Sequence, residues 1–212
     1  MKFERARSNE QKELRLKQIK DATMHLYNTV VYQDISMASI AKELDFTRGN
    51  LYKYYATKEE ILLDVLKDKI NIWHQDLSKA MINLPINDIK QFSKIWAKVT
   101  DESKDFLKLF SILFSIIERN VSIEKLTEFK KEIMASNMAA ANLIKEKFPN
   151  ISDEHIINFI SLQISTIVGL YPLSNPSELQ QKAIQNSGYP YTPPCFLTVF
   201  TEFLETLLNS YT

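Results

Sequence analysis

The stretch SMASIAKELDFTRGNLYKYYATK, residues 36–58, decides the fold of this chain. Apolar residues recur at helical spacing in its first part, and Ser36 is a natural N-cap. Asp45 and Phe46 then form a tight corner, after which Thr47 is placed to cap a second short helix. Two helices of about two turns, joined by such a corner, make a helix-turn-helix. The second helix of such a pair can lie in the major groove of DNA, with its N-terminal side chains at the base edges.

The polar residues of the second helix are suited to DNA. Arg48 carries donors for guanine edges and Asn50 for adenine edges. Gly49 costs up to about 1 kcal/mol of helix stability relative to alanine, which indicates close backbone approach to another surface. We expect base contacts from Arg48 and Asn50, with Thr47 and Lys53 beside them. The same pattern also fits an ordinary helical hairpin with a solvated polar face. The donors that we assign to the phosphate backbone are Ser36, Tyr52, Tyr54 and Lys58.

The order of residues in this stretch resembles the N-terminal domain of the tetracycline-repressor (TetR) family of bacterial transcription regulators. That family typically shows isoleucine-alanine, a small corner, serine or threonine, a basic residue and glycine. Leucine-tyrosine, a histidine- or tyrosine-aromatic pair and lysine-glutamate follow. The resemblance covers about residues 12–66, and its ordered combination is more specific than any single piece. The matching pieces are Ile40-Ala41, Phe46-Thr47-Arg48-Gly49, Leu51-Tyr52, Tyr54-Tyr55 and Lys58-Glu59.

Two residues depart from the family pattern, because Val31 and Asp45 stand where the family usually has glycine. Aspartate adopts a left-handed backbone several-fold more often than most residues, so we expect the corner to persist. Val31 implies a differently shaped exit from the first helix.

Composition favours a helical, globular protein. The chain has 212 residues, 45% of them hydrophobic, and only three glycines. Its formal net charge is zero, so the overall charge does not indicate nucleic acid. Up to residue 20, however, seven lysines and arginines stand against three glutamates. Beside a helix-turn-helix, such a basic arm fits phosphate or minor-groove contacts, although a solubilising end has the same composition.

Several other classes of protein are disfavoured. Cys195 is the only cysteine, which excludes an intrachain disulfide and agrees with a cytoplasmic location. The N-terminus is charged, and the most apolar run, Leu107 to Ile117, is too short to span a bilayer, so we expect no membrane partner. The three histidines are far apart, and no HExxH, CxxC, phosphate loop or nucleophile elbow is present. We therefore expect no enzyme, no catalytic residues, no metal site and no cofactor.

The periodicity predicts an all-α fold of about nine helices in two domains. The resemblance implies a three-helix DNA-binding domain in residues 1–56 and a helical effector-binding and dimerisation domain in residues 57–212. A long helix that begins at Thr57 would join them without a flexible linker, so strain in the second domain would move the reading helix directly.

Two stretches are too apolar for burial on one side, residues 156–170 and the last helix at about 194–211. In the TetR family the last two long helices pair with their copies across a two-fold axis. The resemblance therefore implies a homodimer through these helices, although both would also fit a simple core. Two reading helices about one DNA turn apart suit a pseudo-palindromic operator in double-stranded DNA.

The second domain also contains many aromatic residues, which usually form a core. The family precedent is a small-molecule pocket in this domain. The resemblance thus implies an unidentified small apolar or amphipathic effector, with Trp96, Phe110, Phe114 and Tyr171 as the candidate lining. The run Tyr189-Pro190-Tyr191-Thr192-Pro193-Pro194 fits either a lid or a dimer-contact loop.

The expected function is that of a dimeric DNA-binding transcription regulator, by family analogy a repressor. A small-molecule effector would release it from its operator by binding the DNA-incompetent conformation better. The alternative is a helical ligand-binding or protein-interaction module whose helix-turn-helix does not engage DNA.

Overall fold

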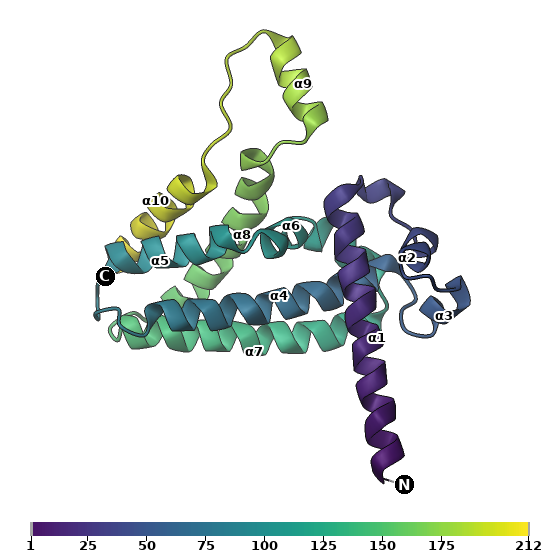
Figure 1. The fold of residues 1–212 in the computed structure, drawn as a ribbon. Helices are drawn as coiled ribbons and strands as arrows, with labels where there is room; N and C mark the ends of the chain where they lie inside the picture. The colour runs from purple at the N-terminus through teal and green to yellow at the C-terminus, as the bar shows by residue number, and fades with distance from the viewer. Residues whose placement is uncertain (1, 212) are drawn as a thin grey trace. The chain divides into compact units, whose positions relative to one another are not determined.

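Helices make up all of the regular secondary structure in residues 2–211, the part of the chain that this computed structural model describes (Figure 1). Side chains are described from residue 9 onward, so Lys2, Arg5 and Arg7 of the expected basic arm lie outside the described side chains. The predicted all-α fold is confirmed, with ten α-helices in the described residues.

The chain packs as two compact units. The first comprises residues 1–68 and 113–130, and the second comprises residues 69–112 and 131–212. Two helices, α4 (Lys58–Met81) and α7 (Ile123–Lys147), begin in the first unit and end in the second. Since this division is one of packing, the functional boundary expected between residues 56 and 57 remains a prediction.

The first unit is built around the helix-turn-helix. Ile19, Ile40, Leu51 and Leu62 are fully buried, one from each of the first four helices. Helical spacing predicts that Leu14 shares the inward face of the first helix with Ile19, and this prediction is wrong for Leu14, which is 57% exposed. It lies in the N-terminal half of α1, which extends beyond the other elements of this unit (Figure 1). Besides the beginnings of α4 and α7, the elements are α1 (Lys2–Thr29), η1 (Tyr32–Asp34), α2 (Met37–Glu43), α3 (Arg48–Tyr52), η2 (Leu113–Ile117) and η3 (Glu118–Asn120).

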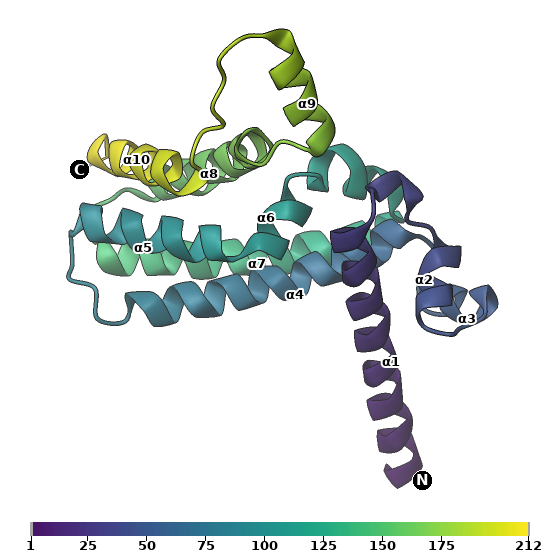
Figure 2. The same ribbon diagram turned by 45° about the horizontal axis from the view of Figure 1, so that its top comes forward.

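The second unit is a helical bundle in which α10 packs on α5 and α8, and α6 packs on α8 (Figure 2). Its core is aromatic, and the Trp73 ring stacks on Phe106 at 5.4 Å between centroids. Two indole N–H groups are satisfied inside this core, one by the Thr100 hydroxyl and the other by the Gln163 amide oxygen. Besides the ends of α4 and α7, the elements are α5 (Ile89–Glu102), α6 (Lys104–Phe110), α8 (Asp153–Ser174), α9 (Glu178–Ser187) and α10 (Phe196–Asn209).

The apolar periodicity of the sequence predicts one helix from about Glu102 to Arg119, and this prediction is wrong. The α-helical part ends at Phe110, and a π-helical turn over Leu113–Ile117 and a 3₁₀ turn follow. The Ser111 hydroxyl donates to the Lys108 carbonyl at 2.9 Å, a bond to the preceding turn of the kind that bends helices.

Candidate DNA-binding site

The first helix of the motif, α2, begins with a reciprocal cap. The Ser39 amide donates to the Ser36 hydroxyl at 3.1 Å, and the Ser36 amide donates to the Ser39 hydroxyl at 2.9 Å. Ser36 is therefore confirmed as the N-cap. Its side chain is also exposed, and its phosphate contact remains a prediction.

The corner after α2 has the backbone that the sequence predicted. Asp45 has a φ of 54°, which lies in the left-handed region of backbone conformation that favours glycine. The Phe46 amide then donates to the Ala41 carbonyl at 2.8 Å, and the Arg15 guanidinium lies 5.1 Å from the centre of the Phe46 ring. Before α2, Val31 has extended backbone, so α1 stops at Thr29.

The reading helix, α3, is anchored by one buried residue and exposes the rest of its first turn. Thr47 caps it, accepting the Asn50 amide at 3.3 Å, while Leu51 is fully buried. Arg48, Gly49 and Asn50 are exposed. A methyl group added at Gly49 would meet nothing within 4 Å, so packing inside the chain does not require glycine there. The first turn of α3 therefore offers an open surface on which another molecule can approach the backbone.

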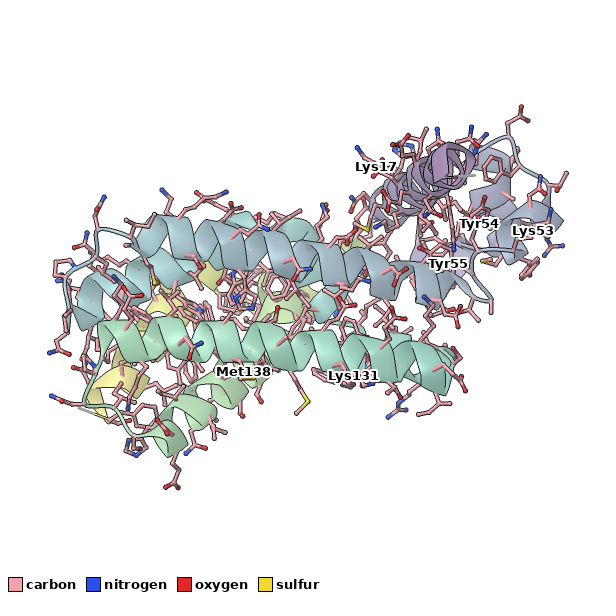
Figure 3. All side chains as sticks on the ribbon, turned by 90° about the horizontal axis from the view of Figure 1, so that it is seen from below. Lys17, Lys53, Tyr54, Tyr55, Lys131 and Met138 are labelled. Carbon is pink, nitrogen blue, oxygen red and sulfur yellow. The ribbon has the colours of Figure 1, made fainter. Side chains whose placement is uncertain are left out.

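The donors expected at the phosphates lie around this surface. Tyr52 and Lys53 are exposed and Tyr54 is half-buried, and Figure 3 shows Lys53 and Tyr54 in the region of α3. The Lys53 ammonium donates to the Asn50 side-chain oxygen at 3.2 Å. This bond orients the Asn50 amide and places a positive charge beside it.

Lys58 is engaged within the chain. Its ammonium donates to the carbonyls of Tyr32 and Ile35 and lies 4.0 Å from the centre of the Tyr32 ring. The Tyr32 hydroxyl donates to the Glu59 carboxylate, and burial together with Glu59 raises the pKa of Tyr32. The phosphate contact expected of Lys58 remains a prediction, and its ammonium has one N–H left for it.

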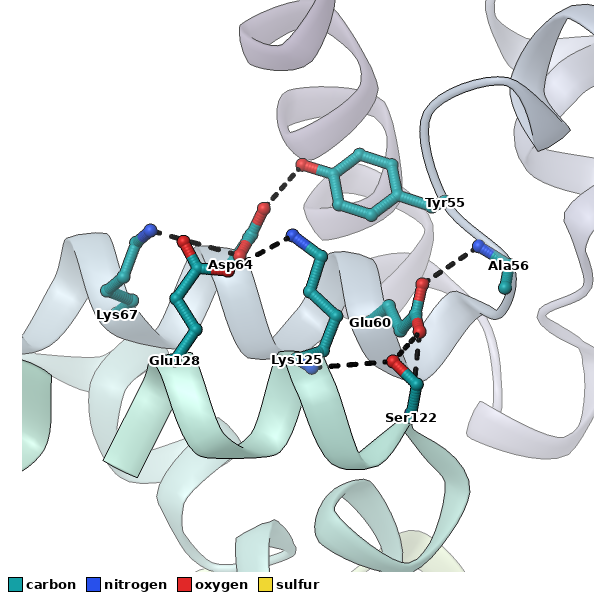
Figure 4. Close-up of polar contacts among 8 residues, drawn as sticks. All are labelled: Tyr55, Ala56, Glu60, Asp64, Lys67, Ser122, Lys125 and Glu128. Carbon is teal, nitrogen blue, oxygen red and sulfur yellow. Dashed lines mark hydrogen bonds and ion pairs between the residues drawn. The ribbon is translucent and has the colours of Figure 1, made fainter. Parts of the chain in front are cut away.

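The sequence did not reveal the contacts that hold the chain just after α3 (Figure 4). The buried hydroxyl of Tyr55 donates to Asp64 at 2.8 Å, and the Ala56 amide donates to Glu60 at 2.9 Å. The Ser122 hydroxyl donates to the same Glu60 carboxylate at 2.9 Å. Burial and then Asp64 raise the pKa of Tyr55, which stays a neutral donor. The spacing from Thr57 to Glu60 in the sequence predicts a capping box. It forms only in part, because the Thr57 hydroxyl accepts the Glu60 amide while the Glu60 carboxylate accepts the Ala56 amide.

The four candidate effector residues are not brought together in one unit. Trp96 is fully buried in the aromatic core of the second unit, where Phe110 is also buried. Tyr171 is half-buried, and its ring lies 6.3 Å from that of Phe196. Phe114 belongs to the first unit and is 44% exposed.

Two hollows of the second unit are lined by other residues. One of about 330 Å³ includes Lys69, Ile72 and Phe106. Another of about 520 Å³ includes Met81, Ile82 and Leu143, from α4, the residue that follows it and α7. The lining proposed from the resemblance therefore remains a prediction. Among the side chains that the structure describes, from residue 9 onward, no group of three or more histidine, cysteine, aspartate or glutamate residues is arranged to hold a metal ion.

Comparison with protein families matches almost the whole chain. Residues 19–65 match the family described as bacterial regulatory proteins, tetR family, and residues 67–210 match the tetracyclin repressor-like C-terminal domain. The chain belongs to the TetR family. The TetR helix-turn-helix thus coincides with the capped corner and the exposed α3 described above, and the chain is a DNA-binding transcription regulator, not an enzyme.

Solved structures share this TetR fold at low sequence identity. The fatty acid degradation regulator FadR from Bacillus halodurans is 16% identical, with 91% of this chain and 93% of that chain covered and a TM-score of 0.57. The multidrug binding protein EbrR, solved with imidazole, is 12% identical, with 91% and 94% covered and a TM-score of 0.55. The TetR-family regulator PfmR from Thermus thermophilus is 14% identical, with 91% and 97% covered and a TM-score of 0.52. No curated protein matches the chain.

Proposed function

We propose that this TetR-family regulator is a homodimeric, cytoplasmic repressor that a small apolar or amphipathic effector releases from a pseudo-palindromic operator. The observation that carries the proposal is the open first turn of α3. Arg48 and Asn50 are exposed there beside a glycine that packing inside the chain does not require. An arginine and an asparagine at the N-terminus of a reading helix are suited to guanine and adenine edges.

The exposed apolar side chains of the last long helices support the homodimer. On α8, Phe159 and Ile167 face the core, whereas Ile157 is 64% exposed and Leu162 is also exposed. The same helix is long and apolar enough to cross a membrane, although a core or interface helix has the same composition. A second copy of the chain would remove this surface from water and would bring two reading helices to one duplex.

Two relatives support the small-molecule effector. One is named a fatty acid degradation regulator, and the other is a multidrug binding protein solved with imidazole. An apolar or amphipathic molecule would also suit the aromatic interior of the second unit, where Trp96 and Phe110 are candidate lining residues.

Binding of the protein to duplexes from its own upstream region tests the proposal. Arg48→Ala and Asn50→Ala should each lose about 1–3 kcal/mol of operator binding and relax specificity at one position. Lys90→Ala, an exposed lysine of α5, is the charge-matched control and should bind as the wild type does. The dimer should persist in all three variants.

The alternative function makes the opposite prediction. If the helix-turn-helix meets protein instead of DNA, the wild type binds no duplex at low salt. Arg48→Ala and Asn50→Ala then weaken self-association or partner binding instead.

A further inference from the structure

Glu60 holds two parts of the first unit that are distant in sequence. One of its oxygens accepts the Ala56 amide at 2.9 Å, four residues after the end of α3. The other accepts the Ser122 hydroxyl at 2.9 Å and the Ser122 amide at 3.4 Å. Glu60 is only 5% exposed, so water does not replace a lost partner easily. The carboxylate therefore fixes the distance between the end of the reading helix and the beginning of α7.

Neighbouring contacts also link the residues just before α4 to α4 and to the beginning of α7. Asp64, one turn further along α4, accepts the hydroxyl of buried Tyr55 at 2.8 Å. On the α7 side, the Lys125 ammonium lies 5.9 Å from the centre of the Tyr55 ring (Figure 4). The Thr57 hydroxyl donates to the Asn120 carbonyl at 3.0 Å. Tyr55, Ala56 and Thr57, the last three residues before α4, thus contact α4 or the segment that leads into α7.

The negative charge of Glu60 is also favourable at the N-terminus of α7. Ser122 precedes α7 and accepts the Lys125 amide at 3.4 Å, so the Glu60 carboxylate sits at the N-terminus of a 25-residue helix. The N-terminus of a helix is electropositive and favours a carboxylate. The N-terminus of α7 therefore makes charge-assisted hydrogen bonds to the same carboxylate that accepts the Ala56 amide.

We infer that Glu60 and Ser122 are positioning residues for DNA binding, through which α7 sets the orientation of the reading helix. This inference rests on the proposed function. It adds α7 to α4 as a second helix that is connected to the reading helix. Because α7 is continuous from Ile123 in the first unit to Lys147 in the second, a shift of α7 acts on the Glu60–Ser122 contact directly.

The test is operator binding by Ser122→Ala with a matched control. Ser152→Ala removes the same kind of cap from α8, where Ser152 accepts the His155 amide at 3.2 Å, but leaves Glu60 untouched. Ser122→Ala should lower operator affinity about tenfold and reduce the preference for operator over an unrelated duplex. Ser152→Ala should bind like the wild type, and Ser122→Thr, which restores the hydroxyl, should recover most of the loss.

A second measurement separates positioning from simple loss of stability. Amide NMR shifts of Arg48, Gly49 and Asn50 should move in Ser122→Ala at a temperature where the protein is fully folded, and should not move in Ser152→Ala. If Ser122→Ala fails to fold, Glu60→Gln takes its place, since its amide can still accept the Ala56 N–H.

The outcomes are distinguishable. Unchanged specificity and unchanged α3 shifts in Ser122→Ala, or equal losses in the two serine variants, would overturn the inference while leaving the DNA-binding proposal intact. A wild-type protein that binds no duplex at low salt would overturn the proposed function itself.

Discussion

The ammonium of Lys58 donates a 2.7 Å hydrogen bond to the backbone carbonyl of Ile35, and a second one of 3.0 Å to the carbonyl of Tyr32. The first turn of α4 is thereby fastened to the segment that leads into α2. Ile35 is buried, so its carbonyl lies where an unpaired acceptor is costly. Lys58 therefore stabilises the arrangement of the motif from within the chain.

Lys58→Met should lower the free energy of unfolding by about 2 kcal/mol, because hydrogen bonds from a charged donor contribute about 1.5–3 kcal/mol. Urea denaturation checks this. Lys53→Met is the control, since Lys53 is exposed and donates only to exposed Asn50, and its effect should stay within about 0.5 kcal/mol. If Lys58→Met leaves stability unchanged and instead flattens the salt slope of DNA binding by about 0.9, the phosphate assignment is favoured.

The corner of the helix-turn-helix predicts a stabilising substitution. Asp45 has a φ of 54°, which glycine adopts without steric cost. Asp45→Gly should raise the free energy of unfolding by about 0.5 kcal/mol, and Asp45→Ala should lower it by about 1 kcal/mol. Asn87, with a φ of 62° in the second unit, offers the matched pair Asn87→Gly and Asn87→Ala. If Asp45→Ala unfolds at a higher urea concentration than Asp45→Gly, a left-handed backbone at Asp45 is contradicted.

The sequence predicted those parts of the fold that depend on local rules. The caps at Ser36 and Thr47, the left-handed Asp45 and the start of α4 all follow from residues within one helical turn. The fold class and family followed from the same stretch, because its residue order is specific. The exposure of Arg48 also agrees with its place on the polar face of α3.

What the sequence missed depends on contacts over long separations. The Glu60–Ser122 bond joins residues 62 positions apart, and no local pattern indicates that these two residues are partners. The α-helix ends at Phe110 despite a strong apolar periodicity, and the Ser111 hydroxyl donates to the Lys108 carbonyl there, a bond that periodicity does not predict. Phe114 was grouped with Trp96 because both are aromatic, yet the two pack in different units.

The proposed dimer can be tested on α8. Ile157→Asp should weaken self-association at least tenfold, because an interface at this position would have to bury an unpaired carboxylate. Ile123→Asp is the control, since Ile123 is 69% exposed, as against 64% for Ile157, but lies in the first unit. Sedimentation equilibrium measures the dimer dissociation constants of the two variants and the wild type. Equal dimerisation by the two variants and the wild type would place the interface away from Ile157.

His74 makes the stability of the protein dependent on pH. Its ring lies against that of Trp73, at 4.7 Å between centroids, and burial lowers the pKa of His74 from 6.5 to about 4. In the unfolded chain this histidine takes up its proton near pH 6.5, whereas in the folded chain it does so only near pH 4. Between these values the unfolded state binds more protons, so this stabilisation is fully present above pH 6.5 and is lost as the pH falls towards 4.

Because the pKa of His74 falls from 6.5 to about 4, and each pH unit between these values is worth about 1.36 kcal/mol, this stabilisation is of the order of 3 kcal/mol. The measurement is the difference in stability between the wild type and His74→Gln, which isolates the contribution of His74 from that of every other group. Urea unfolding at pH 7, 5.5 and 4.5 should show the wild type losing about 1 kcal/mol more per pH unit than the variant. Parallel curves for the two proteins would mean that the folded chain accepts a proton on His74 without penalty, and that the ring is in contact with water.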